Sequence, residues 1–492
     1  MNLLCKLLLK KKVPEVYWDS RGIIMKFIRE KYPNAEKERI RLDAEIRARL
    51  VMPDREGEEE VSITQYLSYC GTTEFNGETV TDSIMAIQMA LNAHRNVIIP
   101  YSETPIYISR SIIVNSGNRL TVHPETRIVF TTDGIFLRNR NVMDGHYNYV
   151  EPGAHSDYDI VVSGGIWEAP NTIIIGNPRP FDGYMGCDSM FLLHNVIGVR
   201  LEHICFRHSN RMCVMIGNCR NFVVEDIEFS GVNRDGIHVE GPAYDGLIRD
   251  IKGKTGDDMI ALNAWDWTNA SLTFGNIYNL IVEDIECEPG YLWSEMRLHP
   301  GNYVLPNGRA IECSVYNIIM QNIHGIHTVK LYNQPNLMPG YNFDKSFGLG
   351  SIYNLYCDNI TFDYYPVENY YTVKNACFEL HADAYNLNFS NISVNYPLCD
   401  SKYSNYRFFA VGPISATWKI NDNPDDWFDF FDPDSVCHAD RITMSDISVN
   451  GQKCLDADKL LYLRKQTVNP DYPKTTPAGG TGFGIVKEFW LD

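Results

Sequence analysis

Asn221-Phe-Val-Val-Glu-Asp-Ile227 is the first clear copy of a short pattern that the chain repeats. Further copies are Asn279-Leu-Ile-Val-Glu-Asp-Ile285, Asn317-Ile-Ile-Met-Gln-Asn-Ile323, Asn354-Leu-Tyr-Cys-Asp-Asn-Ile360 and Asn386-Leu-Asn-Phe-Ser-Asn-Ile392. In each copy aliphatic residues mostly alternate with other residues, which is the period of a β-strand. Short strands that recur in this way predict an all-β fold, a parallel β-helix in which stacked coils bury one continuous core.

The Asx-Ile pair that ends each copy has a local role. Asn and Asp tolerate left-handed backbone and bond to the nearby main chain, so they suit the bend between two strands. Stacked copies are expected to form a ladder of side chains along the helix. A β-sandwich or a propeller is the alternative, but uneven spacing and the lack of hairpin turns at fixed positions disfavour both.

Composition limits the classes of partner. The chain has 492 residues, 44% hydrophobic and 22% charged, so it can bury an extensive core. Its formal net charge of -18 argues against nucleic acid as a general partner, because phosphate binding needs clustered Lys and Arg. A local basic pocket could still hold an anionic substrate. No apolar stretch reaches the roughly 18 residues of a membrane-spanning helix, so we expect no membrane partner.

The cysteines and the first residues bear on location. The apolar run in Met1–Lys12 is interrupted by Lys6, and most of its basic residues follow it, which is the wrong order for a secretory signal. The 13 cysteines show neither a CxxC pair nor zinc-type spacing. We therefore expect a reduced, cytoplasmic protein. The alternative is a sequence from which a signal has been trimmed.

The repeats divide the chain into three parts. Residues 1–75 carry charged segments of helical period, such as Ile40–Leu50, and are expected to form an N-terminal helical extension. Residues 76–450 form the β-helix, and Thr81–His94 reads as an amphipathic helix that would cover its open end. Residues 451–492 contain Pro and Gly clusters and are expected to wrap the last coil.

Two polar strings stand out from the repeats: Asn233-Arg234-Asp235-Gly236 and Thr255-Gly256-Asp257-Asp258. They lie about one coil apart, so their aspartates are expected on neighbouring coils of one outer face. Asp257 and Asp258 are consecutive, so both can serve only if the backbone turns there, which Gly256 permits. Hydrolysis of a glycosidic bond needs one carboxylic acid and one carboxylate, about 6.5–9.5 Å apart in inverting enzymes. Alternatively, these aspartates belong to the bends of the ladder.

With these motifs the sequence resembles the polygalacturonase family of glycoside hydrolases, family 28, over roughly residues 75–450. Gly164-Gly165-Ile166-Trp167-Glu168 resembles the early glycine-rich strand of that family. The Asp235 string resembles its Asn-Thr-Asp-Gly motif, Gly256-Asp257-Asp258 its Gly-Asp-Asp motif, and Val329-Lys330 the end of its Arg-Ile-Lys motif. The resemblance implies a right-handed β-helix, with Asp257 as general acid and with Asp235 and Asp258 activating water.

The sequence also departs from that family. The Gly-His-Gly motif of the family should fall near residues 289–292, but no histidine is there, and Glu295, Arg297 and His299 follow instead. Thr328 stands where the family has the Arg of Arg-Ile-Lys. The carboxylates therefore match, whereas half of the clamp for a substrate carboxylate does not.

Several residues near the motifs are candidates for substrate binding. Lys330 could bind a uronate carboxylate or a hydroxyl as a point charge, or be a solvated lysine. Arg297 could contact the sugar or form an ordinary salt bridge, and Glu295 could be a fourth acid. His299 lies in the same segment. Trp265 and Trp267 could form a subsite wall, or pack in the core.

The function we predict is an inverting glycosidase that acts on an oligosaccharide, with carbohydrate as its partner and with no cofactor. His324 and His327 lie close in sequence without a third ligand, so no metal site is expected. The first alternative is a polysaccharide lyase that holds Ca²⁺ with the three aspartates. The second is a β-helix that binds carbohydrate without catalysis, because fold alone does not settle function.

Overall fold

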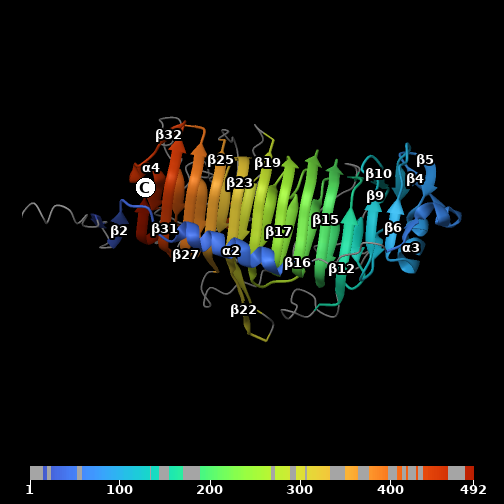
Figure 1. Ribbon diagram of the computed structural model, residues 1–492, viewed down its shortest axis with the longest axis horizontal. Coiled ribbons are helices and arrows are strands. Elements are labelled where there is room, and N and C mark those ends of the chain that lie inside the picture. The colour runs from blue at the N-terminus through green and yellow to red at the C-terminus, as the bar shows by residue number, and fades with distance from the viewer. Residues whose placement is uncertain are drawn as a thin grey trace, which may run out of the picture.

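The computed structural model describes residues 15–18, 24–51, 58–132, 134–142, 155–169, 189–266, 272–288, 295–304, 307–332, 350–363, 376–396, 407–412, 417–418, 428–429, 436–463 and 483–492. They form a long right-handed parallel β-helix, which confirms the predicted fold class. Figure 1 shows the strands stacked side by side along one axis.

Strand pairing divides each central coil into three stretches. In β17 (Ile237–Gly253), residues 237–240 pair with β18 (Asp258–Asn263), and residues 243–249 pair with β19 (Ile277–Cys287). Beyond the bend at Asp250, residues 251–253 pair with the end of β19. These stretches stack into three faces, which we call the site face, the ladder face and the third face.

The strands follow the faces in chain order. The site face contains β8 (Ile112–Val114), β11 (Leu137–Asn139), β14 (Ser189–His194), the starts of β16 (Met212–Ser230) and β17, β18, β20 (Glu295–His299), β24 (Val329–Tyr332), β26 (Ala376–His381), β28 (Arg407–Val411) and β33 (Leu461–Leu463). The ladder face contains β3 (Glu60–Ser62), β6 (Asn96–Ile99), β9 (Arg119–Val122), β12 (Asp157–Ser163), β15 (Val196–Arg207), the later parts of β16 and β17, β19, β23 (Val315–Ile326), β25 (Ser351–Phe362), β27 (Asp383–Val394), β31 (Val436–Val449) and β34 (Phe483–Leu491).

Shorter elements complete the described chain. The third face contains β5 (Glu78–Asp82), β7 (Ile106–Ile108), β10 (Arg127–Phe130), β13 (Ile166–Glu168) and the ends of the long strands. Antiparallel pairs are β1 (Glu15–Trp18) with β2 (Ile24–Ile28), β4 (Gly71–Phe75) with β5, β21 (Gly301–Val304) with β22 (Ala310–Cys313), β29 (Thr417–Trp418) with β30 (Phe428–Asp429), and β31 with β32 (Gln452–Lys453).

Two side-chain ladders follow from the repeated pattern. The first and the sixth residue of each copy have positive φ, as at Asn279 (56°), Asp284 (56°) and Asn317 (55°). The Asn317 amide donates to Asn279 Oδ1 at 2.9 Å, and the Asn354 amide donates to Asn317 Oδ1 at 2.9 Å. This confirms both the bend role of the Asx residues and the predicted ladder.

Helix α2 (Ala35–Arg49) lies along the ladder face (Figure 1). Its Leu42 and Ile46 are buried against outward-facing apolar residues of that face, Val223, Leu247, Ile281 and Ile319. Arg47 Nη2 also contacts Glu283 Oε2 at 2.5 Å. In the first three copies the third residue, Val223, Ile281 or Ile319, breaks strict alternation because α2 covers it. We did not predict this packing from the sequence.

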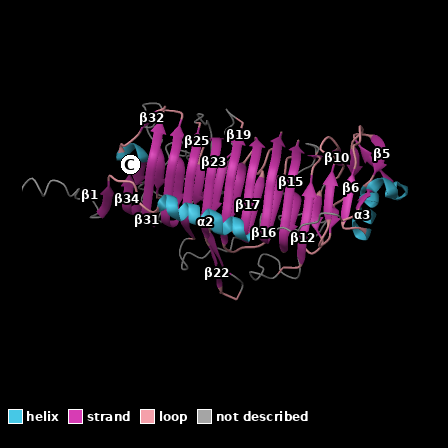
Figure 2. Cartoon of the chain, viewed as in Figure 1, coloured by secondary structure: helices cyan, strands magenta, loops and turns pink. Residues whose placement is uncertain are grey.

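The two ends of the β-helix are built from different segments (Figure 2). At one end lie the 3-10 helix η1 (Ile63–Tyr69) and α3 (Ile84–Ala93), whose Ile87 and Ala90 belong to the main core. At the other end β2 pairs in parallel with β34, and α4 (Ala457–Leu460) lies close by. Residues 1–75, expected to be helical, thus include strands as well, because β2 extends the ladder face past the last coil. The three domain limits stay a prediction.

Two general features concern the described part of the chain. None of its helices is long and apolar enough to span a membrane. Its ten cysteines are free thiols, and most are buried, as at Cys213, Cys219 and Cys357. Such thiols pack as small apolar residues of the core.

Candidate active site

The three aspartates of the two strings meet at the start of the site-face strands. Asp235 lies in the turn before β17, and Asp257 and Asp258 lie where β18 begins on the next coil. The Gly236 amide donates to the Asp258 carbonyl at 2.8 Å, which fixes the register of the two coils. One carboxylate oxygen from each aspartate lies within 4.8 Å of the others. Asp235 and Asp258 are buried, and Asp257 is only partly buried.

Gly256 brings the second string close to the first. Residues 256–257 form a bend, as expected, so the consecutive Asp257 and Asp258 both reach the cluster. A Cβ on Gly256 would lie 2.4 Å from the carbonyl carbon and oxygen of Asn233 on the preceding coil. The glycine is therefore needed for the close approach of two coils as well as for the bend.

Two basic side chains from the following coils contact the aspartates. Lys330 Nζ on β24 lies 2.6 Å from Asp258 Oδ1 and 3.0 Å from Glu295 Oε2. Arg297 on β20 contacts Asp258 through Nε at 3.1 Å and Asp235 through Nη2 at 3.6 Å. Glu295 and Lys330 are buried, so these ion pairs are shielded from water and salt.

The surroundings separate the acid strengths of the three carboxyls. Burial, together with the charges of Asp235 and Asp258, raises the pKa of Asp257 to about 6. Burial also raises the pKa of Asp258, although Lys330 and Arg297 oppose the shift. Burial acts in the same direction on Asp235, but the hydrogen bond and charge of His238 outweigh it and hold the pKa of Asp235 well below its usual range. Near neutral pH one carboxyl can hold a proton beside another that stays ionised.

His238 is a site residue that the sequence reading missed. Its Nδ1 lies 2.7 Å from Asp235 Oδ2, and its Nε2 lies 3.4 Å from Asp266 Oδ2. Asn263 donates to Asp266 at 2.6 Å, and Arg297 Nη2 lies 3.6 Å from the same oxygen. Burial alone would lower the pKa of His238, but the hydrogen bond and charge of Asp235 raise it. The sequence offered one signal for this role, because His238 follows Asp235 by only three positions.

A second buried imidazole extends this polar row. His194 Nε2 lies 3.0 Å from Glu240 Oε2, although their strands are separated by the strand of Gly217. A Cβ on Gly217 would lie 2.0 Å from His194 Nε2, so the missing side chain makes room for the ring. Glu240 also accepts the Leu272 amide at 3.1 Å.

Some candidates for substrate binding are buried in the interior of the β-helix. Trp265 belongs to the main core and packs edge-on against His299, with ring centroids 5.3 Å apart, so our prediction of a sugar platform is wrong for Trp265. His299 is also buried, and burial, together with the charge of Arg297, lowers its pKa well below the usual range. Its imidazole is therefore neutral, and it packs against Trp265. Trp267 lies outside the described residues.

The three carboxyls form a tight cluster, because one oxygen of each lies within 4.8 Å of the others. This limit joins nearest oxygens and is a different quantity from the roughly 6.5–9.5 Å between the two carboxyl groups of inverting enzymes. Such a cluster is also compact enough for a divalent cation, but Lys330 and Arg297 already contact both oxygens of Asp258.

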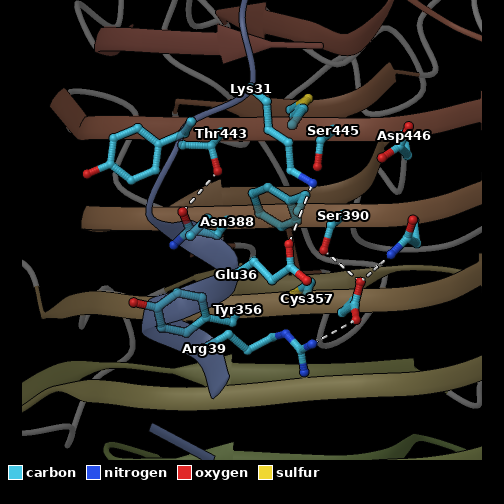
Figure 3. Close-up of a pocket in the computed structure, with 16 residues that line it drawn as sticks. Lys31, Glu36, Arg39, Tyr356, Cys357, Asn388, Ser390, Thr443, Ser445 and Asp446 are labelled. Carbon is cyan, nitrogen blue, oxygen red and sulfur yellow. Dashed lines mark hydrogen bonds and ion pairs between the residues drawn. The ribbon is translucent and has the colours of Figure 1, made fainter. Parts of the chain in front are cut away.

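A separate cavity lies between α2 and the ladder face (Figure 3). It has a volume of about 120 Å³ and is lined by residues such as Lys31, Arg39, Asn388 and Thr443. Charged groups of this cavity pair with one another, since Arg39 Nη2 lies 3.5 Å from Asp358 Oδ2. The other oxygen of Asp358, Oδ1, accepts hydrogen bonds from Ser390 and Asn391. This cavity contains none of the three clustered aspartates.

Comparisons with known proteins agree on the fold. No protein-family model matches the chain, and no curated protein matches it in sequence. An exopolygalacturonase from Thermotoga maritima has a TM-score of 0.53 at 11% identity, over 92% of this chain and 96% of that chain. A mutant tailspike protein of E. coli bacteriophage HK620, in complex with a hexasaccharide, has a TM-score of 0.50 at 9% identity, over 91% and 71%. The chain thus shares the architecture of right-handed parallel β-helix proteins.

Proposed function

We propose that this protein is a glycoside hydrolase that cleaves an O-glycosidic bond of an oligosaccharide with inversion. Asp257 protonates the leaving oxygen, and Asp235 and Asp258 hold and activate the attacking water. The observation that carries the proposal is the divergence of acid strength within one cluster: the pKa of Asp257 is raised to about 6, whereas that of Asp235 is held low. Paired carboxyls with separated pKa values mark acid and base roles.

The proposal extends to substrate and location. The motif resemblance to polygalacturonases supports a pectin-derived oligosaccharide, of galacturonate or rhamnogalacturonan type. A cytoplasmic location, which the sequence favours, would make short imported oligomers the substrate. Fractionation of the source cells, followed by immunodetection of the protein, tests the location directly.

A polysaccharide lyase that binds Ca²⁺ is the second candidate, because the three carboxylates are close enough to share a cation. The contacts of Lys330 and Arg297 with Asp258 favour the hydrolase, since these two cations already neutralise one of the three possible ligands. A lyase would lose activity with a chelator and release an unsaturated product that absorbs in the ultraviolet. A hydrolase would do neither.

The test is a panel of defined oligosaccharides, analysed for new reducing ends with and without chelator. The wild-type chain is compared with Asp257→Asn and with Asp226→Asn, a matched control at an exposed position of a ladder. We expect chelator-resistant hydrolysis by the wild type and the control, and none by Asp257→Asn. A complete absence of turnover across the panel would instead support a β-helix that only binds carbohydrate.

A further inference from the structure

The cations beside the clustered aspartates are already neutralised by carboxylates. Lys330 Nζ is held between Asp258 at 2.6 Å and Glu295 at 3.0 Å, and all three side chains are buried. Arg297 is held by Asp258, Asp235 and Asp266 at 3.1–3.6 Å. Lys330 or Arg297 could bind a substrate carboxylate only if an existing buried ion pair were broken, which costs free energy.

Carboxylates outnumber cations among the described residues of the site. Even when Asp257 carries its proton, five further carboxyls surround the cluster, against the four cations Arg234, His238, Arg297 and Lys330. The five are Asp235, Glu240, Asp258, Asp266 and Glu295. Glu379, another buried acid, pairs in register with Lys330 on the next strand. The field at the cluster is thus unfavourable to an added negative charge.

Thr328 stands where the motif of the resembling family has an arginine, and it supplies no charge. Thr328 is fully buried, and its hydroxyl donates to the Ala376 carbonyl at 2.8 Å. Its side chain is therefore bound to the neighbouring coil of the β-helix.

We propose that the sugar unit held at the bond to be cleaved is uncharged, and that Glu295 enforces this choice by neutralising Lys330. The inference rests on the proposed hydrolase function. It excludes galacturonate as the unit at the cleaved bond and keeps, among the pectin-derived substrates, those with a neutral sugar at that position. Carboxylates only accept hydrogen bonds, and a neutral sugar offers hydroxyl donors to them. A uronate unit would bring a second set of acceptors and a like charge into a buried site.

The first arm of the test compares substrates that differ only in this charge. Each uronate-containing oligosaccharide of a panel, with oligogalacturonides first, is supplied as such and after reduction of its carboxyls to primary alcohols. Linkage and stereochemistry are then the same within each pair. We expect kcat/KM to be higher for the reduced member by at least about tenfold, which corresponds to ~1.4 kcal/mol.

The second arm tests the specificity residue itself. Glu295→Gln keeps the shape of the side chain and removes one of the two carboxylates that neutralise Lys330, which keeps its contact with Asp258. The negative charge at the site falls by one, so a substrate carboxylate is repelled less. The ratio of kcat/KM for the charged over the reduced member should then rise about tenfold. Glu228→Gln is the matched control, because Glu228 is partly exposed and pairs with Lys252 at 3.6 Å. It should leave the ratio unchanged.

The outcomes separate this inference from the hydrolase proposal. Equal or better cleavage of the charged member by the wild type would overturn the inference while the enzyme still turns over. An unchanged ratio in a folded Glu295→Gln variant would remove Glu295 from the proposal. If neither member of any pair is hydrolysed, the hydrolase proposal fails, and the inference fails with it. Should Glu295→Gln not fold, as judged by circular dichroism, the wild-type ratio still decides the charge of the sugar.

Discussion

Asp257 and Asp235 have the same side chain, and their neighbours give the two carboxyls opposite acid strengths. Burial, and the charges of two other carboxyls, favour the protonated form of Asp257. Asp235 is buried beside the His238 imidazole at 2.7 Å, which favours its ionised form. Charge and hydrogen bonding thus assign different tasks to neighbouring residues.

The pH dependence of hydrolysis should follow these assignments. Because Asp257 must be protonated to act as the acid, and its pKa is about 6, kcat/KM should fall about tenfold per pH unit above that value. The low pKa of Asp235 keeps this base ionised in mildly acidic solution, whereas the raised pKa of Asp258 makes it the first of the two bases to be protonated on acidification. Initial rates measured from pH 4 to pH 9 check this. A flat profile up to pH 8 would remove Asp257 as the proton donor.

Replacement of His238 should alter the acidic side of the same profile. His238→Gln keeps a hydrogen-bond donor near Asp235 but removes the positive charge, so the pKa of Asp235 should rise. Activity should then be lost at higher pH on acidification than in the wild type. His203→Gln is the control, because His203 contacts the exposed Asp226 at 2.7 Å away from the cluster. An acidic limb at the wild-type pH in His238→Gln would show that His238 does not hold Asp235 ionised.

At the scale of the element, the bends and helix α2 stabilise the scaffold that holds the site. Each Asx bend combines a left-handed backbone with a side-chain bond to the next coil, so the ladder supports both the turn and the stacking. Helix α2 covers a column of apolar residues that would otherwise face water on the ladder face. Burial of such a column contributes stability in proportion to the apolar area removed from water.

The two roles of a ladder residue can be separated at Asn317. Asn317→Gly keeps the left-handed backbone and loses the amide bonds, whereas Asn317→Ala loses both. We expect the alanine variant to be less stable than the glycine variant by roughly 1–2 kcal/mol, the cost of left-handed backbone for a residue with a Cβ. Urea denaturation of both variants measures the difference. Equal stability would mean that backbone strain is not important at this bend.

The attachment of α2 can be tested on the helix itself. Ile46 is fully buried against the ladder face, and Ile46→Ala should weaken the packing by about 2–5 kcal/mol. Ile40 on the same helix is exposed, so Ile40→Ala is the matched control. Amide hydrogen exchange over Ala35–Arg49 should accelerate in the first variant and not in the second. Unchanged exchange in Ile46→Ala would contradict the packing.

At the scale of the whole molecule, the features that depend on local sequence pattern could be predicted, whereas the contacts between distant residues could not. The heptapeptide period was enough to predict the coils, the Asx bends and the ladder, because these depend on neighbours within a strand and on identical positions of adjacent coils. The same regularity placed Asp235 one coil before Asp257 and Asp258. The packing of α2 was not predictable, because Arg47 and Glu283 are 236 residues apart in sequence.

The environment of the cluster also depends on contacts between distant residues. Asp258 meets Lys330 and Arg297 across three coils of uneven length, so spacing along the chain gave no sign that these charges neutralise one another. Trp265 looked like a sugar platform from its place after the motif, but its ring faces inward to the core. Whether a residue just after β18 points outward or into the core depends on the path of the coil.

The central claim is that Asp257 donates the proton in an inverting hydrolysis. Proton NMR of the first products from the best substrate of the panel tests it most directly, with wild type and Asp257→Asn measured side by side. We predict a new reducing end of inverted configuration from the wild type. For Asp257→Asn we predict a rate lower by about 10²–10⁴-fold with little change in melting temperature. A product of retained configuration, or normal turnover by Asp257→Asn, would contradict the account.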